Sequence, residues 1–423
     1  MKLKSLSIAM MLTSLPMTGA LAAAMDRSAQ SVSAFLQPGN YAEAGLFVLD
    51  PNVSGTSSDS PLLGPARNQS SGDMAGSYHS ANAAIKVQAT DKISIGLLFD
   101  QPFGADAEYK APNAGLNAFS ANNEGTSATV SSENLTLLFG YQPSTNWNFY
   151  AGPVWQQVKG DVHLRGTAYS LLGGTPVPVS PSVAIPGQAY DAKIQRKEAW
   201  GWAAGLAYQI PEIALKASLT YRSAIKHQHD AIETFGGNST ASLGQPIPIR
   251  TDTTEVKTPQ SVNLDFQTGV MENTIAFATV RWVNWDGFAI RPNAFGQVLD
   301  AMANSGDPRF SKLKGGNLVE YNKDQWTINA GVGRKFNEKW SANMSVGWDS
   351  GAGDPITTLG PTKGYWSLGL GGQYSPAENY FVQAGIKYFW LGDAQALTVA
   401  NDNVGQFNNN HALGYGLKFG YRF

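Results

Sequence analysis

The segment Trp340–Asp349, WSANMSVGWD, alternates apolar and polar residues with a period of two. Its even-numbered residues are apolar, and its odd-numbered residues are polar or small. Side chains of a β-strand alternate between two faces, so the segment is predicted to be a strand with one apolar and one polar face. A tryptophan stands at each end of the apolar face, at Trp340 and Trp348. Aromatic residues in these places are typical of strands that cross a membrane.

The same alternation recurs along most of the chain. Runs begin near fourteen positions: Tyr41, Asn82, Ile93, Leu135, Trp147, Trp200, Ile213, Val262, Thr274, Trp326, Trp340, Trp366, Tyr380 and Leu413. Short connections take turns with long ones, which fall at roughly 51–77, 105–133, 162–197, 226–260, 286–325, 352–363 and 393–410. This pattern predicts an all-β fold, a transmembrane antiparallel β-barrel of about 14 strands, with short periplasmic turns and long external loops. A soluble β-sandwich is the alternative, and the aromatic positions favour the barrel.

The composition agrees with a membrane barrel and excludes several classes of function. The 423 residues are 43% hydrophobic and only 15% charged, carry a net charge of −2 and include no cysteine. The lack of cysteine excludes a disulfide scaffold, a thiolate metal site and an iron–sulfur cluster. The net charge gives no general attraction to nucleic acid. Lipid around the barrel and a lumen of Gly, Ser, Asn and Gln would account for the low charge.

No motif in the chain predicts an enzyme. There is no G-x-S-x-G elbow, no H-E-x-x-H helix and no P-loop. His227 and His229 would share a strand face and could ligate a metal, but a polar loop entry is favoured because no third ligand stands near them. A lipase would need a Ser–His pair, and nothing selects one around His411. We therefore expect no catalytic residue, no metal and no cofactor.

Several short motifs resemble one known family. They are Asp91–Gly96, Pro102–Gly104, Glu108-Tyr109, Asn134-Leu135, Tyr141-Gln142, Asn146–Phe149, Pro259–Ser261, Trp282–Trp285, Lys323–Trp326 and Gly364–Trp366. In order and spacing they are similar to the FadL-type (OmpP1/FadL) outer-membrane long-chain fatty acid transporter family, over most of the chain from about residue 80. The resemblance implies a fourteen-stranded barrel with a small N-terminal plug that carries hydrophobic molecules across the bacterial outer membrane. Residues 25–38 lack the Asn-Pro-Ala turn that is usual in the family's plug.

The chain is expected to divide into a signal peptide, a plug and a barrel. Lys2 and Lys4 precede an apolar stretch at 6–15 and a small-residue end at Ala22–Ala24, the pattern of a secretory signal. We expect the signal peptide at 1–24, the plug segment at 25–40 and the outer-membrane barrel at 41–423. The aromatic C-terminal residue, Phe423, predicts recognition by the barrel-assembly machinery.

Two long loops carry apolar residues that a water-filled pore does not need. Six of these residues are candidates to contact an apolar substrate: Leu171, Leu172, Phe295, Val298, Leu299 and Met302. The last four have the spacing of an amphipathic helix. They could form a groove for an acyl chain, or the loops could pack on each other as a lid. In the resemblance, Lys159 and Lys323 occupy the positions of the family's ligand-contacting cations, and Arg165 lies nearby. Each of the three could bind a substrate carboxylate. The alternative for each is a charge that faces solvent or lipopolysaccharide.

The third strand contains Pro102, Phe103 and Gly104, and both proline and glycine interrupt strands. The resemblance implies that a kink here opens the barrel wall and lets substrate leave sideways into the membrane; the alternative is a loop that begins at Pro102. We predict a monomeric passive transporter for long-chain fatty acids or similar hydrophobic molecules, in contact with outer-membrane lipid and lipopolysaccharide. An aromatic or alkane hydrocarbon channel of the same family and a general porin are the alternatives.

Overall fold

The computed structural model describes residues 24–60, 63, 66–110, 117–121, 123–169, 190–235, 249–399 and 401–423. Seventeen strand segments form one sheet, and the first, β1, pairs with the last, β25, so that the sheet closes on itself. Three barrel strands are interrupted and consist of two segments each, namely β4 with β5, β11 with β12, and β13 with β14. The result is a closed antiparallel barrel of 14 strands, which confirms the predicted fold class.

The barrel strands are β1 (Tyr41–Asn52), β3 (Tyr78–Gln88), β4 (Ile93–Asp100), β5 (Gly104–Glu108), β8 (Ser127–Tyr141), β9 (Trp147–Leu164), β10 (Tyr190–Ile210), β11 (Leu215–Arg222), β12 (Ile225–Phe235), β13 (Arg250–Thr258), β14 (Ser261–Met271), β15 (Thr274–Val283), β18 (Gln325–Lys335), β19 (Trp340–Asp349), β21 (Tyr365–Ala377), β22 (Tyr380–Leu391) and β25 (His411–Arg422). The connections contain β2 (Gly55–Ser57), β6 (Ser120–Ala121), β7 (Glu124–Gly125), β16 (Ala289–Ile290), β17 (Val319–Glu320), β20 (Ile356–Thr357), β23 (Ala394–Thr398), β24 (Asn401–Phe407), helix α2 (Asn293–Ala303) and the short 3₁₀ turns η2 (Thr167–Tyr169), η3 (Pro211–Ile213) and η4 (Pro308–Leu313). None of the described helices is long and apolar enough to span a bilayer.

The two aromatic girdles follow from the strand register. Trp366 lies directly across from Trp348 on one side and from Trp390 on the other, and all three face outward near one end of the barrel. Near the other end Trp340 lies across from Tyr374. Between the two levels the outward side chains are apolar and exposed, as a surface in contact with lipid requires.

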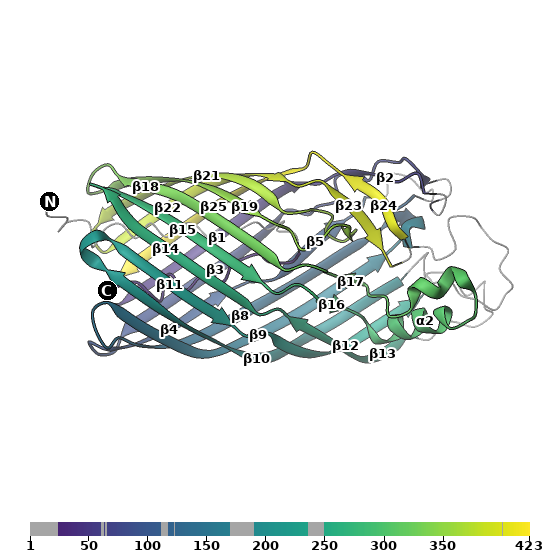
Figure 1. Ribbon diagram of the computed structural model, residues 1–423, viewed down its shortest axis with the longest axis horizontal. Coiled ribbons are helices and arrows are strands. Elements are labelled where there is room, and N and C mark those ends of the chain that lie inside the picture. The colour runs from purple at the N-terminus through teal and green to yellow at the C-terminus, as the bar shows by residue number, and fades with distance from the viewer. Residues whose placement is uncertain are drawn as a thin grey trace.

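The two ends of the barrel differ, as the connection lengths predict. The C-terminus and the short turns lie at one end, and α2, β23 and β24 lie at the other (Figure 1). At that second end β2, β24, β23 and β20 form a separate four-stranded sheet from three different connections. In an outer-membrane barrel the end with the long connections faces outside the cell.

The predicted loops at 162–197 and 226–260 were partly wrong, because strands continue through them. β12 and β13 pair with each other from Ile225–Thr258 to Glu233–Arg250, well beyond the tryptophan girdle. There the pattern is inverted, since His227 and His229 are buried inside while Lys226 and Gln228 are exposed outside. A strand whose outer face is in water does not need apolar residues there, so the alternation typical of a membrane strand is missing.

Residues 25–40 lie inside the barrel and contact inward-facing side chains. The Lys216 ammonium donates to the carbonyl of Leu36 at 2.6 Å, and Lys86 donates to the carbonyls of Gln37 and Gly39 at 3.0 and 2.9 Å. We refer to residues 25–40 as the plug segment. These bonds come from β11 and β3, so the segment is held from different sides of the barrel.

Candidate functional site

The wall of the barrel lacks a continuous hydrogen-bond ladder at the third barrel strand. β5 pairs with β8, and on its other side its backbone bonds to residues 74–76, which precede β3. The β3–β4 ladder ends at the pair Ala83–Phe99. Beyond this pair the Ala81 N–H donates instead to the side-chain oxygen of Gln101, at 3.0 Å. The predicted kink residues lie here: Pro102 and Phe103 fall between β4 and β5, and Gly104 is the first residue of β5. We call this place the wall interruption.

The plug segment supplies hydrogen bonds to the wall interruption that β3 does not. The Arg27 N–H donates to the carbonyl of Pro102 at 2.6 Å, and the Gly104 N–H donates to the carbonyl of Met25 at 2.9 Å. Asp26 thereby bridges Phe103 in antiparallel fashion. Proline has no N–H and cannot donate to a strand ladder. The bond from Arg27 uses only the carbonyl of Pro102, so it does not require that missing N–H.

A buried polar network holds the same part of the plug segment from the opposite wall. Arg281 on β15 forms an ion pair with Asp26 at 2.6 Å, and both side chains are about 95% buried or more. The guanidinium also donates to the side-chain oxygens of Asn263 at 2.7 Å and Gln30 at 3.0 Å. Nearby, Arg222 donates to the backbone carbonyl of Gln30 at 3.0 Å. Each charge therefore has a partner, which is the condition under which buried charges are tolerated.

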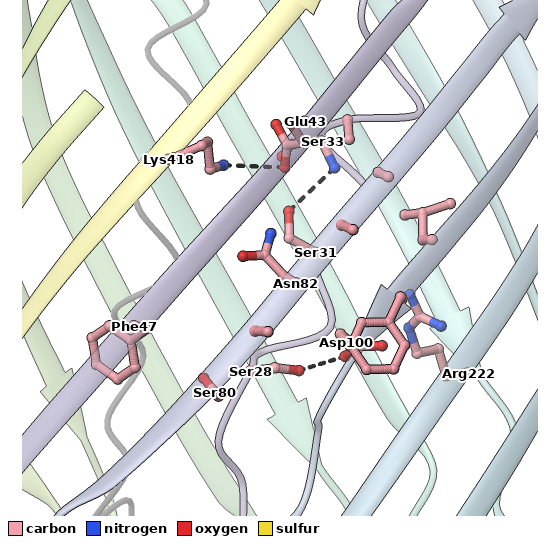
Figure 2. Close-up of a pocket in the computed structure, with 16 residues that line it drawn as sticks. Ser28, Ser31, Ser33, Glu43, Phe47, Ser80, Asn82, Asp100, Arg222 and Lys418 are labelled. Atoms are coloured by element: carbon pink, nitrogen blue, oxygen red, sulfur yellow. Dashed lines mark hydrogen bonds and ion pairs between the residues drawn. The ribbon is translucent and has the colours of Figure 1, made fainter. Parts of the chain in front are cut away.

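A pocket opens between the plug segment and the wall formed by β25, β1, β3 and β4, and we call it the wall pocket. Figure 2 shows Ser28 and Ser31 of the plug segment facing Glu43, Asn82 and Asp100 of the strands. Lys418 and Glu43 form a buried ion pair at 3.2 Å, and the Ser28 hydroxyl donates to Asp100. Residues 81–84 of β3 and residues 98 and 99 of β4 line the side of the pocket next to the wall interruption.

A second cavity, the plug cavity, lies on the other side of the plug segment, toward the long connections. It is lined mainly by apolar residues, including Met25, Val53, Met74 and Leu359, together with Arg27, Tyr78 and Asp106. The Arg27 guanidinium lies 3.8 Å from the centre of the Tyr78 ring. Burial lowers the pKa of Arg27, and the fields of Tyr78 and Asp106 oppose that shift. The side chain remains charged at neutral pH.

A third cavity, the roof cavity, lies beside α2 among the long connections. Its apolar lining residues are Leu164, Tyr169, Phe295, Leu318, Leu397 and Val399. The predicted amphipathic helix is present as α2, and its Phe295 and Leu299 side chains are buried against the core. Val298 and Met302 are half-buried against the same core. Leu171 and Leu172 lie outside the described residues.

α2 is fixed to the barrel by a carboxylate at its N-terminus. The Ala294 and Phe295 N–H groups donate to the two oxygens of Glu233 at 2.9 and 2.7 Å, and the Tyr190 hydroxyl donates to the same carboxylate at 3.0 Å. Glu233 is fully buried on β12. A negative charge at a helix N-terminus satisfies otherwise free N–H groups and interacts favourably with the helix dipole.

Glu233→Gln is expected to loosen α2, because the amide retains one oxygen acceptor and places its N–H₂ group against one of the two backbone N–H donors. We expect the local opening free energy of α2 to fall by about 1–3 kcal/mol, the cost of leaving a buried donor without a partner. Hydrogen exchange of the amides at 293–303 measures it. The matched control is Glu255→Gln on neighbouring β13, whose carboxylate is exposed and should not affect α2. Unchanged exchange in Glu233→Gln would refute the role of this carboxylate.

The structure does not bring the three predicted carboxylate-binding cations together. Lys159 lies on the exposed outer face of β9, and Lys323 is exposed in the connection before β18. Arg165 is buried and already paired with Glu124 at 2.7 Å and Asp191 at 2.8 Å. Sequence reasoning missed the cations that face the plug segment. The sequence does contain a signal for such cations. Arg281, for example, is a charged residue at a lumen-facing position of a strand, and its neighbours on the lipid face are apolar.

The two histidines that could have suggested a metal site have protein partners. The His227 imidazole hydrogen-bonds through Nε2 to the side chain of Gln156 at 2.9 Å and through Nδ1 to the carbonyl of Lys197 at 3.2 Å. His229 hydrogen-bonds to the carbonyl of Gln195 at 2.8 Å. Among the described residues no three His, Cys, Asp or Glu side chains are grouped to hold a metal ion.

Comparison with known proteins places this architecture among outer-membrane channels. A FadL homologue from Pseudomonas aeruginosa superimposes with a TM-score of 0.68 at 14% identity, covering 92% of each chain. The toluene transporter TodX of Pseudomonas putida gives 0.61 at 14% identity, covering 96% of this chain and 98% of its own. The toluene transporter TbuX of Ralstonia pickettii gives 0.57 at 13% identity, covering 97% and 96%. No curated protein matches the sequence.

At these identities the superpositions show the fold alone. Family membership comes from the sequence. The family profile described as outer membrane protein transport protein (OMPP1/FadL/TodX) matches residues 22–423. The chain therefore belongs to this family: it is an outer-membrane β-barrel that transports hydrophobic compounds, and it is a channel rather than an enzyme.

Proposed function

We propose that the protein takes up long-chain fatty acids, or similar hydrophobic molecules, and releases them sideways into the outer membrane. The substrate would enter the roof cavity beside α2, pass to the plug cavity, and leave by the wall pocket and the wall interruption. The three cavities support this order because the first lies among the long connections and the last adjoins the strand edges of β3 and β4. The plug segment lies between the second and the third.

The observation that carries the proposal is the break in the ladder between the pairs Ala83–Phe99 and Ala75–Ala107. Transfer of an acyl chain from water to hydrocarbon is favourable by about 0.8 kcal/mol for each methylene group. A hydrophobic molecule that left through the periplasmic end would lose this free energy, whereas a molecule that left through the wall would keep it. For such a substrate, an exit through the wall at the level of the lipid therefore costs less free energy than an exit into water.

A hydrocarbon channel is the second candidate, because two of the similar structures are toluene transporters by name. A neutral hydrocarbon needs no cation, whereas a fatty acid brings a carboxylate. Lys159, Lys323 and Arg165 remain the sequence-based prediction for that carboxylate. Lys159 and Lys323 have exposed side chains, and Arg165 would have to give up two ion pairs.

A disulfide across the wall interruption tests the exit route. We expect Ala81→Cys/Gln101→Cys, once oxidised, to reduce uptake of radiolabelled oleate by cells at least tenfold, because the bond joins the two edges between which the substrate would pass. Reduction with dithiothreitol should restore uptake. The chain has no cysteine, so no other disulfide can form within it.

The matched control is Ile85→Cys/Leu97→Cys, which joins directly paired, outward-facing residues of the intact ladder and should leave uptake unchanged. If the oxidised Ala81–Gln101 variant transports oleate as fast as the reduced one, lateral release at this place is wrong. Large, steady ion conductance of the wild-type protein in planar bilayers would instead favour a general porin.

A further inference from the structure

Two side chains that line the plug cavity each contain a buried polar atom without a hydrogen-bond partner among the described residues. These atoms are Nε of Arg27 and the hydroxyl of Tyr78. Such groups are rare in native proteins, because a buried donor without a partner costs about 1–3 kcal/mol. The two atoms belong to neighbouring side chains in one cavity, which is otherwise mainly apolar. Together they indicate a ligand with a hydrogen-bond acceptor at this place.

The surroundings of the Arg27 guanidinium determine how it can bind. The position of a Cβ atom on Gly104 would lie 2.6–2.7 Å from Nη1, Cζ and Nε. Nearly equal distances to these three atoms place that point over the face of the guanidinium rather than beside its edge. The Tyr78 ring centre lies 3.8 Å from Cζ. Packing against Gly104 and Tyr78 thus fixes the plane, and the N–H donors, which lie in that plane, remain to bind a ligand.

The neighbouring charges do not satisfy this guanidinium. In the described part of the chain, no ion pair joins Arg27 to a carboxylate within 4.0 Å. Asp106 also lines the plug cavity, but it acts on Arg27 through its field. By contrast, Arg281 and Arg165 each have at least one carboxylate partner. Arg27 is therefore the arginine of the plug segment with spare binding capacity in a cavity.

We propose that Arg27 and Tyr78 bind the carboxylate of an anionic amphiphile in the plug cavity, while its hydrocarbon chain lies against Met25, Val53, Met74 and Leu359. A carboxylate accepts several hydrogen bonds and suits the planar donor set of an arginine, with the tyrosine hydroxyl as an additional donor. A neutral hydrocarbon would leave both donors without partners. This inference rests on the proposed transport function and deepens it, since it selects a carboxylate-bearing substrate over a hydrocarbon.

The position of Arg27 connects binding with the exit. Its backbone N–H is bonded to Pro102 at the wall interruption, and its side chain lies against Gly104 in the same strand. A carboxylate held by Arg27 therefore lies beside the place where the wall lacks its ladder. The sequence-based candidates Lys159 and Lys323 have no such relation to the kink.

The test compares two probes of the same chain length, oleate and 1-octadecene, on the purified full-length protein. We expect Arg27→Gln to weaken oleate binding by about 10- to 100-fold, the range for a charge-assisted hydrogen bond, and to leave octadecene binding unchanged. Tyr78→Phe should weaken oleate binding by about 3- to 10-fold with the same selectivity. Arg27→Lys keeps the charge without the planar donor set and should recover part of the oleate affinity.

Controls separate this inference from the proposed function and from loss of structure. Arg334→Gln makes the same change at an exposed arginine of β18 and should bind both probes like the wild type. Normal octadecene binding by Arg27→Gln shows that the cavity is intact. If wild-type protein binds neither probe, the proposed function fails; if it binds oleate and Arg27→Gln binds it equally well, only the carboxylate site is refuted. Equal weakening of both probes would assign Arg27 a structural role and also overturn the proposal.

Discussion

Arg281→Met is expected to release the plug segment and to convert the closed barrel into an ion-conducting one. The substitution leaves Asp26 buried without its ion-pair partner, and breaking a buried pair in this way costs about 3–5 kcal/mol. It also removes the donors to Asn263 and Gln30. Recordings in planar lipid bilayers should show steady single-channel conductance at least several times that of the wild type.

The double variant Asp26→Leu/Arg281→Met provides the sharpest check, because it removes both charges and leaves no isolated ion. We expect it to conduct less than Arg281→Met alone, since apolar replacement of a complete buried pair is often neutral. Arg334→Met on β18 is the control for loss of an arginine, as that side chain is exposed. Wild-type conductance in Arg281→Met would show that the ion pair does not hold the plug segment.

Phe35→Ala is expected to detach the inner part of the plug segment. The ring is 1% exposed and packs 5.6 Å from Tyr150, centre to centre. Cβ atoms placed on Gly96 and Gly140 would lie 2.4 and 2.8 Å from Phe35 atoms, so these two glycines leave the space that the ring fills. Removing a buried phenylalanine ring costs about 3–5 kcal/mol. Limited trypsin digestion, with cleavage after Arg27, should be at least tenfold faster than in the wild type.

Two variants bracket this result. Gly96→Val should have the same effect from the opposite side, because the added side chain would occupy the position of the ring. Phe139→Ala on β8 removes an outward-facing ring that is 51% exposed and should not alter cleavage. If Phe35→Ala is cleaved at the wild-type rate, packing of this ring does not secure the plug segment.

The barrel could be predicted from the sequence because lipid imposes a strict requirement on one face of every strand. The alternation in Trp340–Asp349 reports that requirement directly, and the tryptophans mark its limits. Where the strands leave the membrane, as in β12, the requirement ends and the prediction failed. His227 and His229 then face a packed interior, and the strand is revealed by its cross-strand pairing with β10 and β13.

The candidate site was less predictable because its parts are joined by contacts that are distant along the chain. Asp26 meets Arg281 across 255 residues, and Arg27 meets Pro102 through a backbone pairing that leaves no mark in either segment. The kink at Pro102–Gly104 was recognisable, since proline and glycine interrupt strands whatever their surroundings. Arg27 was not, because a single arginine near the N-terminus does not show whether its donors are satisfied. That depends on the cavity that the folded barrel builds around it.

The pairing of residues 25–27 with the wall interruption also restricts how the plug segment can move. In a surrounding without water, the carbonyl of Pro102 and the N–H of Gly104 would each cost several kcal/mol if they lost their partners. The least costly displacement therefore keeps these two bonds and turns residues 28–40 about residues 25–27 as a hinge. The rate of substrate release would then depend on breaking side-chain contacts such as those of Phe35 and Lys216, while the barrel wall itself stays folded throughout the cycle.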